Sequence, residues 1–143
     1  MIDAVELLRS IHGHAGVLAV AALIHPVVFL RAGRPLSRGQ RWATGGAAAF
    51  VAGVYASGLA LYPGYRERER PVLMHDDFAL ALWFERKEHL AFVAVVLAVG
   101  AALLVLARRD GAYNGTARWM AGGAAALAGV AVGVGSVVGA WNP

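Results

Sequence analysis

The histidines are the side chains of this chain best suited to chemistry near neutral pH, because imidazole exchanges protons there and binds haem and metals. Three of the five lie in one stretch without charge, residues 11–30, IHGHAGVLAVAALIHPVVFL. His14 and His25 are 11 positions apart, so a helix places them on one stripe. Because lipid cannot satisfy polar groups, we expect this stripe to face protein or a cofactor.

The elements that must position these histidines are membrane-spanning helices. The chain has 143 residues, 59% hydrophobic and only 15% charged, and a soluble domain would be about one quarter charged. The sequence therefore predicts an all-α, polytopic membrane protein in which residues 1–143 form a single transmembrane domain, a four-transmembrane-helix bundle. The apolar runs place the spans at about 11–31, 42–62, 89–107 and 118–140.

Three features between and within the spans predict local structure. Pro63 and Gly64 form a turn signal that ends the second span. Residues 74–87 predict an interfacial amphipathic helical segment before helix 3. In the last span, Gly129 and Gly133 are four residues apart, as are Gly135 and Gly139, and such spacing of small residues favours close packing between helices.

The distribution of basic residues predicts the orientation. The first and last loops are rich in arginine, whereas the middle loop mixes both signs of charge. Because cytoplasmic loops carry an excess of Lys and Arg, we expect a multi-pass protein of the inner (cytoplasmic) membrane with both termini on the outer side. The basic residues sit in short loops between apolar runs, so the pI near 10.1 does not indicate nucleic-acid binding.

A haem site is the most specific chemistry that the spacing suggests. Helices 1 and 3 cross the membrane in the same direction, so His14 and His89 come to similar depths on the same side. Two neutral imidazoles from different helices of a bundle are suitable axial ligands of haem b. On helix 3, Glu85 shares the face of His89 and is expected to accept its other ring N–H. Arg66 and Arg86 lie where they would meet the haem propionates.

The pattern GHAGVLAVAALIHP, the four spans and the histidines at helix mouths resemble small four-helix membrane b-type cytochromes of the cytochrome b561-like kind. The resemblance implies haem b and electron transfer. The chain departs from that family because spans 2 and 4 contain no histidine, so His25 has no evident partner. His25 is expected to face the bundle interior, near another helix or a second cofactor.

Three functions remain open from the sequence. The first is a haem b electron-transfer protein or subunit that exchanges electrons with membrane quinol. The second is a cofactor-free accessory subunit of a larger respiratory or photosynthetic membrane complex. The third is a non-haem metal site that contains His14 and His89, with His12, His75 and Glu85 or Glu88 beside them, because imidazole and carboxylate suit Zn, Cu or Fe. His12 itself is expected to lie at the membrane interface.

Overall fold

The computed structural model describes residues 3–140, in which every regular element is a helix and no strand occurs. Four helices are long and apolar enough to cross a membrane, which confirms the predicted all-α architecture. Residues 1–2 and 141–143 of the predicted domain lie outside the described part. The helices are α1 (Ala4–Phe29), α2 (Arg38–Gly64), η1 (Tyr65–Glu69), α3 (Arg70–Asp76), α4 (Phe78–Ala107) and α5 (Asn114–Ala140).

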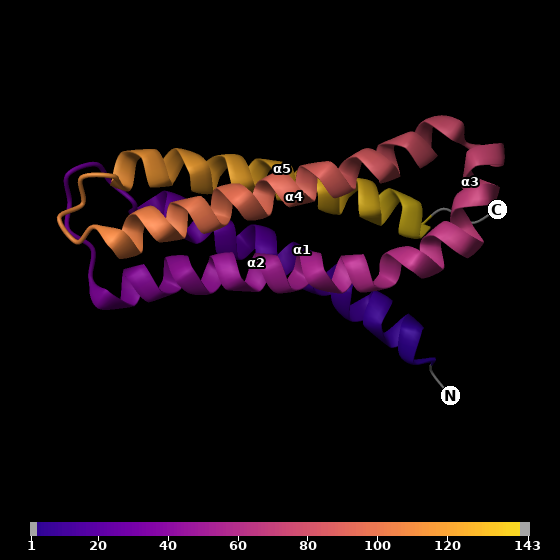
Figure 1. The fold of residues 1–143 in the computed structure, drawn as a ribbon, viewed down its shortest axis with the longest axis horizontal. Helices are drawn as coiled ribbons and strands as arrows, with labels where there is room; N and C mark the ends of the chain where they lie inside the picture. The colour runs from indigo at the N-terminus through magenta and orange to yellow at the C-terminus, as the bar shows by residue number, and fades with distance from the viewer. Residues whose placement is uncertain (1–2, 141–143) are drawn as a thin grey trace.

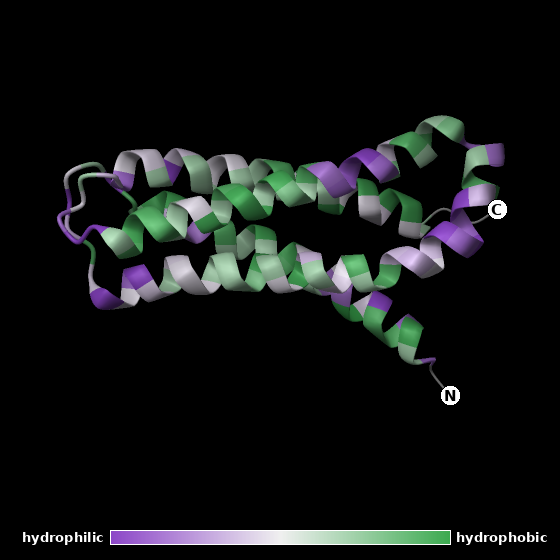
Figure 2. Cartoon of the chain, in the orientation of Figure 1, coloured by the Kyte–Doolittle hydropathy of each residue, from purple (hydrophilic) through white to green (hydrophobic). Residues whose placement is uncertain are grey.

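The four long helices form one elongated antiparallel bundle (Figure 1). Both α1 and α4 pack against α2 and α5, so α1 and α4 lie diagonally across the bundle. One end, called the terminal end here, carries the start of α1, the end of α5 and helix α3 (Figure 1). The other, the loop end, carries the connections 30–37 and 108–113. Hydrophilic segments gather at these ends, and apolar residues dominate between them (Figure 2).

The helix that contains Pro63 differs from its predicted shape. The turn expected at Pro63–Gly64 is wrong, because α2 runs through both residues and continues into η1, a π-helix, and then α3. After the proline the chain makes a wider helical turn, in which the Arg70 N–H reaches the carbonyl of Tyr65, five residues back. Such single π-turns are frequent at functional sites.

The stretch before helix 3 is helical, as predicted, but it is interrupted once. Helix α3 ends at Asp76 and α4 begins at Phe78. Asp77 separates them, and its carboxylate accepts the N–H of Leu80 at 2.9 Å. This is an N-cap, which satisfies one of the backbone donors that a helix start leaves free. Helix α4 is therefore a single rod that carries residues 78–87 beyond the predicted span.

The core is built from small residues. Among the buried residues of its central cluster, only Leu23 and Val51 are larger than alanine. Small side chains let membrane helices approach closely, and van der Waals packing then holds them together. The buried members of the cluster are Ala19, Leu23, Ala48, Val51, Ala94, Ala98, Ala102, Ala124 and Ala128.

The predicted close contact at the glycines of α5 is wrong. A Cβ built on Gly129, Gly133, Gly135 or Gly139 meets nothing within 4 Å outside its own helix. The α5 glycines that do approach another helix are Gly122 and Gly123, nearer the loop end. At the terminal end the helices diverge instead, and the open space there forms a cavity.

Candidate functional site

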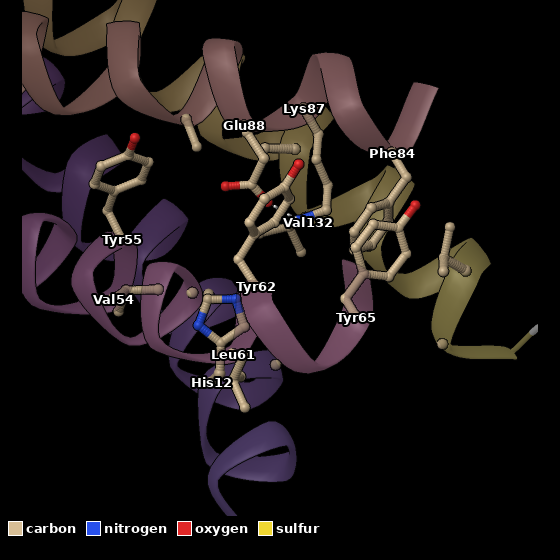
Figure 3. Close-up of a pocket in the computed structure, with 18 of the residues that line it drawn as sticks. His12, Val54, Tyr55, Leu61, Tyr62, Tyr65, Phe84, Lys87, Glu88 and Val132 are labelled. Carbon is tan, nitrogen blue, oxygen red and sulfur yellow. Dashed lines mark hydrogen bonds and ion pairs between the residues drawn. The ribbon is translucent and has the colours of Figure 1, made fainter. Parts of the chain in front are cut away.

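A cavity of about 690 Å³ opens between the helices of the terminal half. Its inner wall is apolar and includes Val51, Val54, Ala94 and Ala128. Nearer the terminal end, polar side chains from three helices and η1 reach the same space (Figure 3). The polar lining residues used below are His12, Tyr62, Tyr65, Lys87 and Glu88.

His12 is the histidine of this cavity, and its ring is half-buried. Its Nδ1 lies 2.8 Å from Ser57 Oγ on α2. Ser57 Oγ in turn donates its only proton to the carbonyl of Val54 at 2.7 Å. The hydroxyl can then only accept from the ring, so Nδ1 carries the imidazole proton. In the neutral ring this leaves Nε2 as a hydrogen-bond acceptor.

The α4 wall of the cavity carries an ion pair. Lys87 Nζ lies 2.7 Å from Glu88 Oε1, and the two side chains are only 13% and 19% exposed. Lys87 Nζ also lies 4.1 Å from the centre of the Phe84 ring, a cation–π contact. Glu88 and His12 approach the cavity from different helices (Figure 3). A carboxylate and an acceptor imidazole therefore share one pocket with a fixed ammonium.

Tyr65 contributes a hydroxyl that lacks a partner. The residue is 4% exposed, and its hydroxyl oxygen has no hydrogen-bond partner among the described residues. Its ring packs against Phe84 with centroids 4.1 Å apart. Because Tyr65 begins the π-helix, the irregular end of α2 fixes where this ring lies. A buried hydroxyl without a partner costs about 1–3 kcal/mol.

Ion pairs also join the elements around the mouth of the cavity. Arg9 on α1 pairs with Glu69 of η1 at 2.5 Å. Arg70 Nε donates to Glu85 on α4. The predicted contact of Glu85 with His89 is therefore wrong: within residues 3–140 no hydrogen bond joins the two, and the carboxylate serves Arg70 instead.

The structure places the predicted haem ligands on the outside of the bundle. His14, His25 and His89 are all exposed. His14 Nδ1 bonds the carbonyl of Ser10 at 2.8 Å, and His25 packs edge-on against Phe29 with centroids 5.4 Å apart. The expectation that His25 faces the interior is wrong. Since α1 and α4 are diagonal, outward-facing His14 and His89 do not form an axial pair within the bundle.

The remaining predicted residues also lie at the surface. Arg66 and Arg86 are exposed, and the Arg86 guanidinium lies 5.7 Å from the centre of the Trp83 ring. His75 Nδ1 lies 2.7 Å from Asp76 Oδ1. Across residues 3–140, no group of three or more His, Asp or Glu side chains is arranged to hold a metal ion. The metal alternative thus gains no support from the arrangement.

The residue that prediction missed is His12, whose expected place was the interface. His12 lies on the face of α1 that also carries Gly16, Ala19 and Leu23, which are spaced three or four residues apart and are buried. His14, two residues on, is turned by about 200° and points away. The row of small residues could have identified this face in the sequence, because small residues are typical of the packed face of a membrane helix.

In comparisons with known proteins, no protein-family model, no curated protein and no solved structure matches this chain. The resemblance to cytochrome b561-like proteins therefore stays a prediction from the residues.

Proposed function

We propose that this protein is a membrane subunit that binds a quinone or quinol in the cavity of the terminal half. The observation that carries the proposal is the acceptor nitrogen of His12, which the hydrogen bonds through Ser57 to Val54 set in place beside an apolar wall. A quinol has hydroxyl groups at its head and an apolar tail. An apolar pocket with a few converging polar groups is the usual form of a site for such a ligand.

The dimensions and polarity of the cavity support this ligand. A volume of about 690 Å³ lies within the range of roughly 300–1,000 Å³ that is common for small-molecule sites. The ring of the ligand would occupy the polar end near His12 and Tyr65. Its tail would follow the apolar wall toward Val51 and Ala128.

The residues also suit the proton chemistry of a quinol. Oxidation of a quinol to a quinone releases two protons and two electrons. His12 Nε2 is free to accept a proton from a ligand hydroxyl, while the Nδ1–H stays hydrogen-bonded to Ser57 Oγ. Glu88, which lines the same cavity, is a second group able to accept a proton. The electrons require an acceptor, which we assign to a redox partner or cofactor outside this cavity.

Equilibrium binding of a short-tailed quinol, kept reduced, to the purified protein tests the proposal, because only the quinol has hydroxyl groups that can donate to His12 Nε2. Calorimetric titration in detergent should give a saturable site, and His12→Ala should weaken it about tenfold, the equivalent of one hydrogen bond of about 1.4 kcal/mol. His14→Ala is the matched control, because it removes the same group from the outer face of the same helix. Equal losses in both variants, or no saturable binding to the unaltered protein, would refute the proposal.

A second candidate is an accessory subunit of a larger membrane complex. The observation that favours it is the exposure of His14 and His25 on an otherwise apolar helix. Polar side chains at membrane depth almost always face protein or water. A partner subunit that covers this side of α1 would satisfy them.

Mild solubilisation from native membranes tests this second candidate. The protein should migrate as part of a larger complex, and replacement of His14 and His25 by Leu should release it, whereas Leu at His12 should not. Migration as a free 14.9 kDa chain under all conditions would contradict it. The same preparation tests the proposal of haem b. A reducible visible spectrum that is lost on His14→Ala would place haem at this outer face. A colourless protein from cells grown with ample haem would exclude haem b.

A further inference from the structure

The loop end carries a large surplus of positive charge. Seven arginines lie in residues 31–41 and 108–118, with Asp110 as the only acid there. That acid is engaged by Arg108, whose Nε lies 3.8 Å from Asp110 Oδ2. Among residues 3–140, none of the other six arginines at this end forms an ion pair with a carboxylate.

Three of these arginines surround a hollow of about 370 Å³. Arg38 and Arg41 come from the first turn of α2, and Arg109 follows the end of α4. Within residues 3–140, none of the three forms an ion pair with a carboxylate. The remaining lining is apolar and consists of Trp42 and Leu106. Guanidinium groups bind phosphate oxygens through paired hydrogen bonds.

The aromatic residues set the depth of this hollow. Trp42, in the first turns of α2, is 66% exposed, and Trp119, in the first turns of α5, is 84% exposed. Tryptophan gathers where a bilayer meets water, at the level of the lipid headgroups. Leu106, 48% exposed, lies in the last turn of α4, three residues before Arg109. The hollow thus has cationic groups at headgroup level and an apolar side for acyl chains.

We propose that this hollow, lined by Arg38, Arg41, Arg109, Trp42 and Leu106, binds the phosphate headgroup of an anionic phospholipid. The site is separate from the quinone cavity, which lies at the other end of the bundle. A lipid is favoured over a soluble anion because Trp42 and Leu106 offer exposed apolar surface beside the arginines. Basic pockets between transmembrane helices recognise anionic headgroups in this way.

The test compares two triple variants that remove equal charge. Arg38, Arg41 and Arg109 are changed to Gln in one, and Arg31, Arg34 and Arg118 are changed to Gln in the other, all at the same end of the bundle. Each protein is incorporated into nanodiscs of phosphatidylcholine with increasing phosphatidylglycerol, and bound lipid is counted by native mass spectrometry. The unaltered protein should retain phosphatidylglycerol over phosphatidylcholine. The first triple should lose that preference by about tenfold or more, and the second by less than about threefold.

Each further outcome bears directly on the proposal. Equal losses in the two triples would mean diffuse attraction to a charged surface and would overturn a defined site. Displacement of phosphatidylglycerol by millimolar inorganic phosphate would assign the hollow to a free anion instead of a lipid. The single variant Arg109→Gln guards against misfolding, because it changes one exposed side chain after the end of α4; if it binds phosphatidylglycerol as the unaltered protein does, the site as drawn is wrong.

Discussion

The two ends of this bundle use the same residues, glycine and alanine, for opposite purposes. At the loop end small residues make room for side chains of the neighbouring helix: a Cβ on Gly100 would strike the methyl group of Met120, and one on Gly123 would lie 3.2 Å from Leu97 Cδ1. At the terminal end they leave space, since Gly135 and Gly139 on α5, which line the cavity, have nothing within 4 Å of such a Cβ. Small residues therefore permit close packing without causing it.

The loop end is also closed by hydrogen bonds between its two connections. The Gly33 N–H donates to the Gly111 carbonyl at 3.2 Å, and the amide of Asn114 donates to the Arg34 carbonyl at 2.7 Å. Asn114 is only 2% exposed, so this bond is shielded from water. The terminal end has no comparable clasp of backbone groups among residues 3–140; its helices are joined by partly exposed ion pairs. Such pairs contribute little, about 0–1 kcal/mol each.

This difference teaches how a small bundle can hold a ligand. The tightly packed end fixes the helix arrangement, and the divergent end is free to keep a cavity. Regions with few packed contacts and exposed polar pairs open most easily. We therefore expect changes at the loop end to affect stability, and changes at the terminal end to affect binding.

Gly111→Val should produce the largest loss of stability. Gly111 has φ +78°, and a Cβ there would lie 2.6 Å from the Arg34 carbonyl oxygen. Left-handed strain and the clash together should cost about 3 kcal/mol. Gly33→Val is the control: φ is +70° but nothing lies within 4 Å, so strain alone should cost about 1–2 kcal/mol. Unfolding in detergent, followed by circular dichroism, measures both; equal losses would show that the contact between the loops is unimportant.

Gly100→Val and Gly135→Val compare the two ends directly. At Gly100 the added methyl groups must displace the flexible end of the Met120 side chain, and mild overpacking of this kind costs about 1 kcal/mol. At Gly135, which lines the cavity, the same change meets open space and should alter the free energy of unfolding by about 0.5 kcal/mol or less. The same unfolding measurement applies. A loss at Gly135 as large as that at Gly100 would mean that the terminal end is packed, and the comparison of ends would fail.

The four long helices were predictable from hydropathy alone. A backbone in lipid must satisfy its own hydrogen bonds, so a long apolar run that crosses the membrane is expected to form a helix. The helix ends were harder to predict from the sequence. Pro63 lies inside a helix that continues past it into a π-turn, and nothing in the composition marks that turn. The bond from Asn114 to Arg34 joins residues 80 positions apart and could not be read from local sequence.

The faces of the helices were harder to predict than the helices. In a soluble protein polar residues mark the outside, and in lipid they are expected to mark the inside. His14 and His25 follow neither rule, and they made the outer stripe of α1 look like its functional face. The small residues Gly16 and Ala19, which are buried, identify the true packed face, on which His12 lies. Helix pairing also mattered, because α1 and α4 are diagonal and His14 and His89 both face outward, so the two rings do not meet inside the bundle.

Gly58→Ala should have the smallest effect on stability and a selective effect on binding. A Cβ on Gly58 would lie 3.0 Å from His12 Cε1. The ring is the end of a side chain beside an open cavity, so it can shift, and the free energy of unfolding should change by about 0.5 kcal/mol or less. The shift lengthens the bond from Nδ1 to Ser57 and moves Nε2, so the affinity for the short-tailed quinol should fall about threefold to fivefold. Gly53→Ala on the same helix meets nothing within 4 Å and is the control. If calorimetry gives the two variants the same affinity, the position of the His12 ring does not govern the site, and the terminal end loses its assigned role.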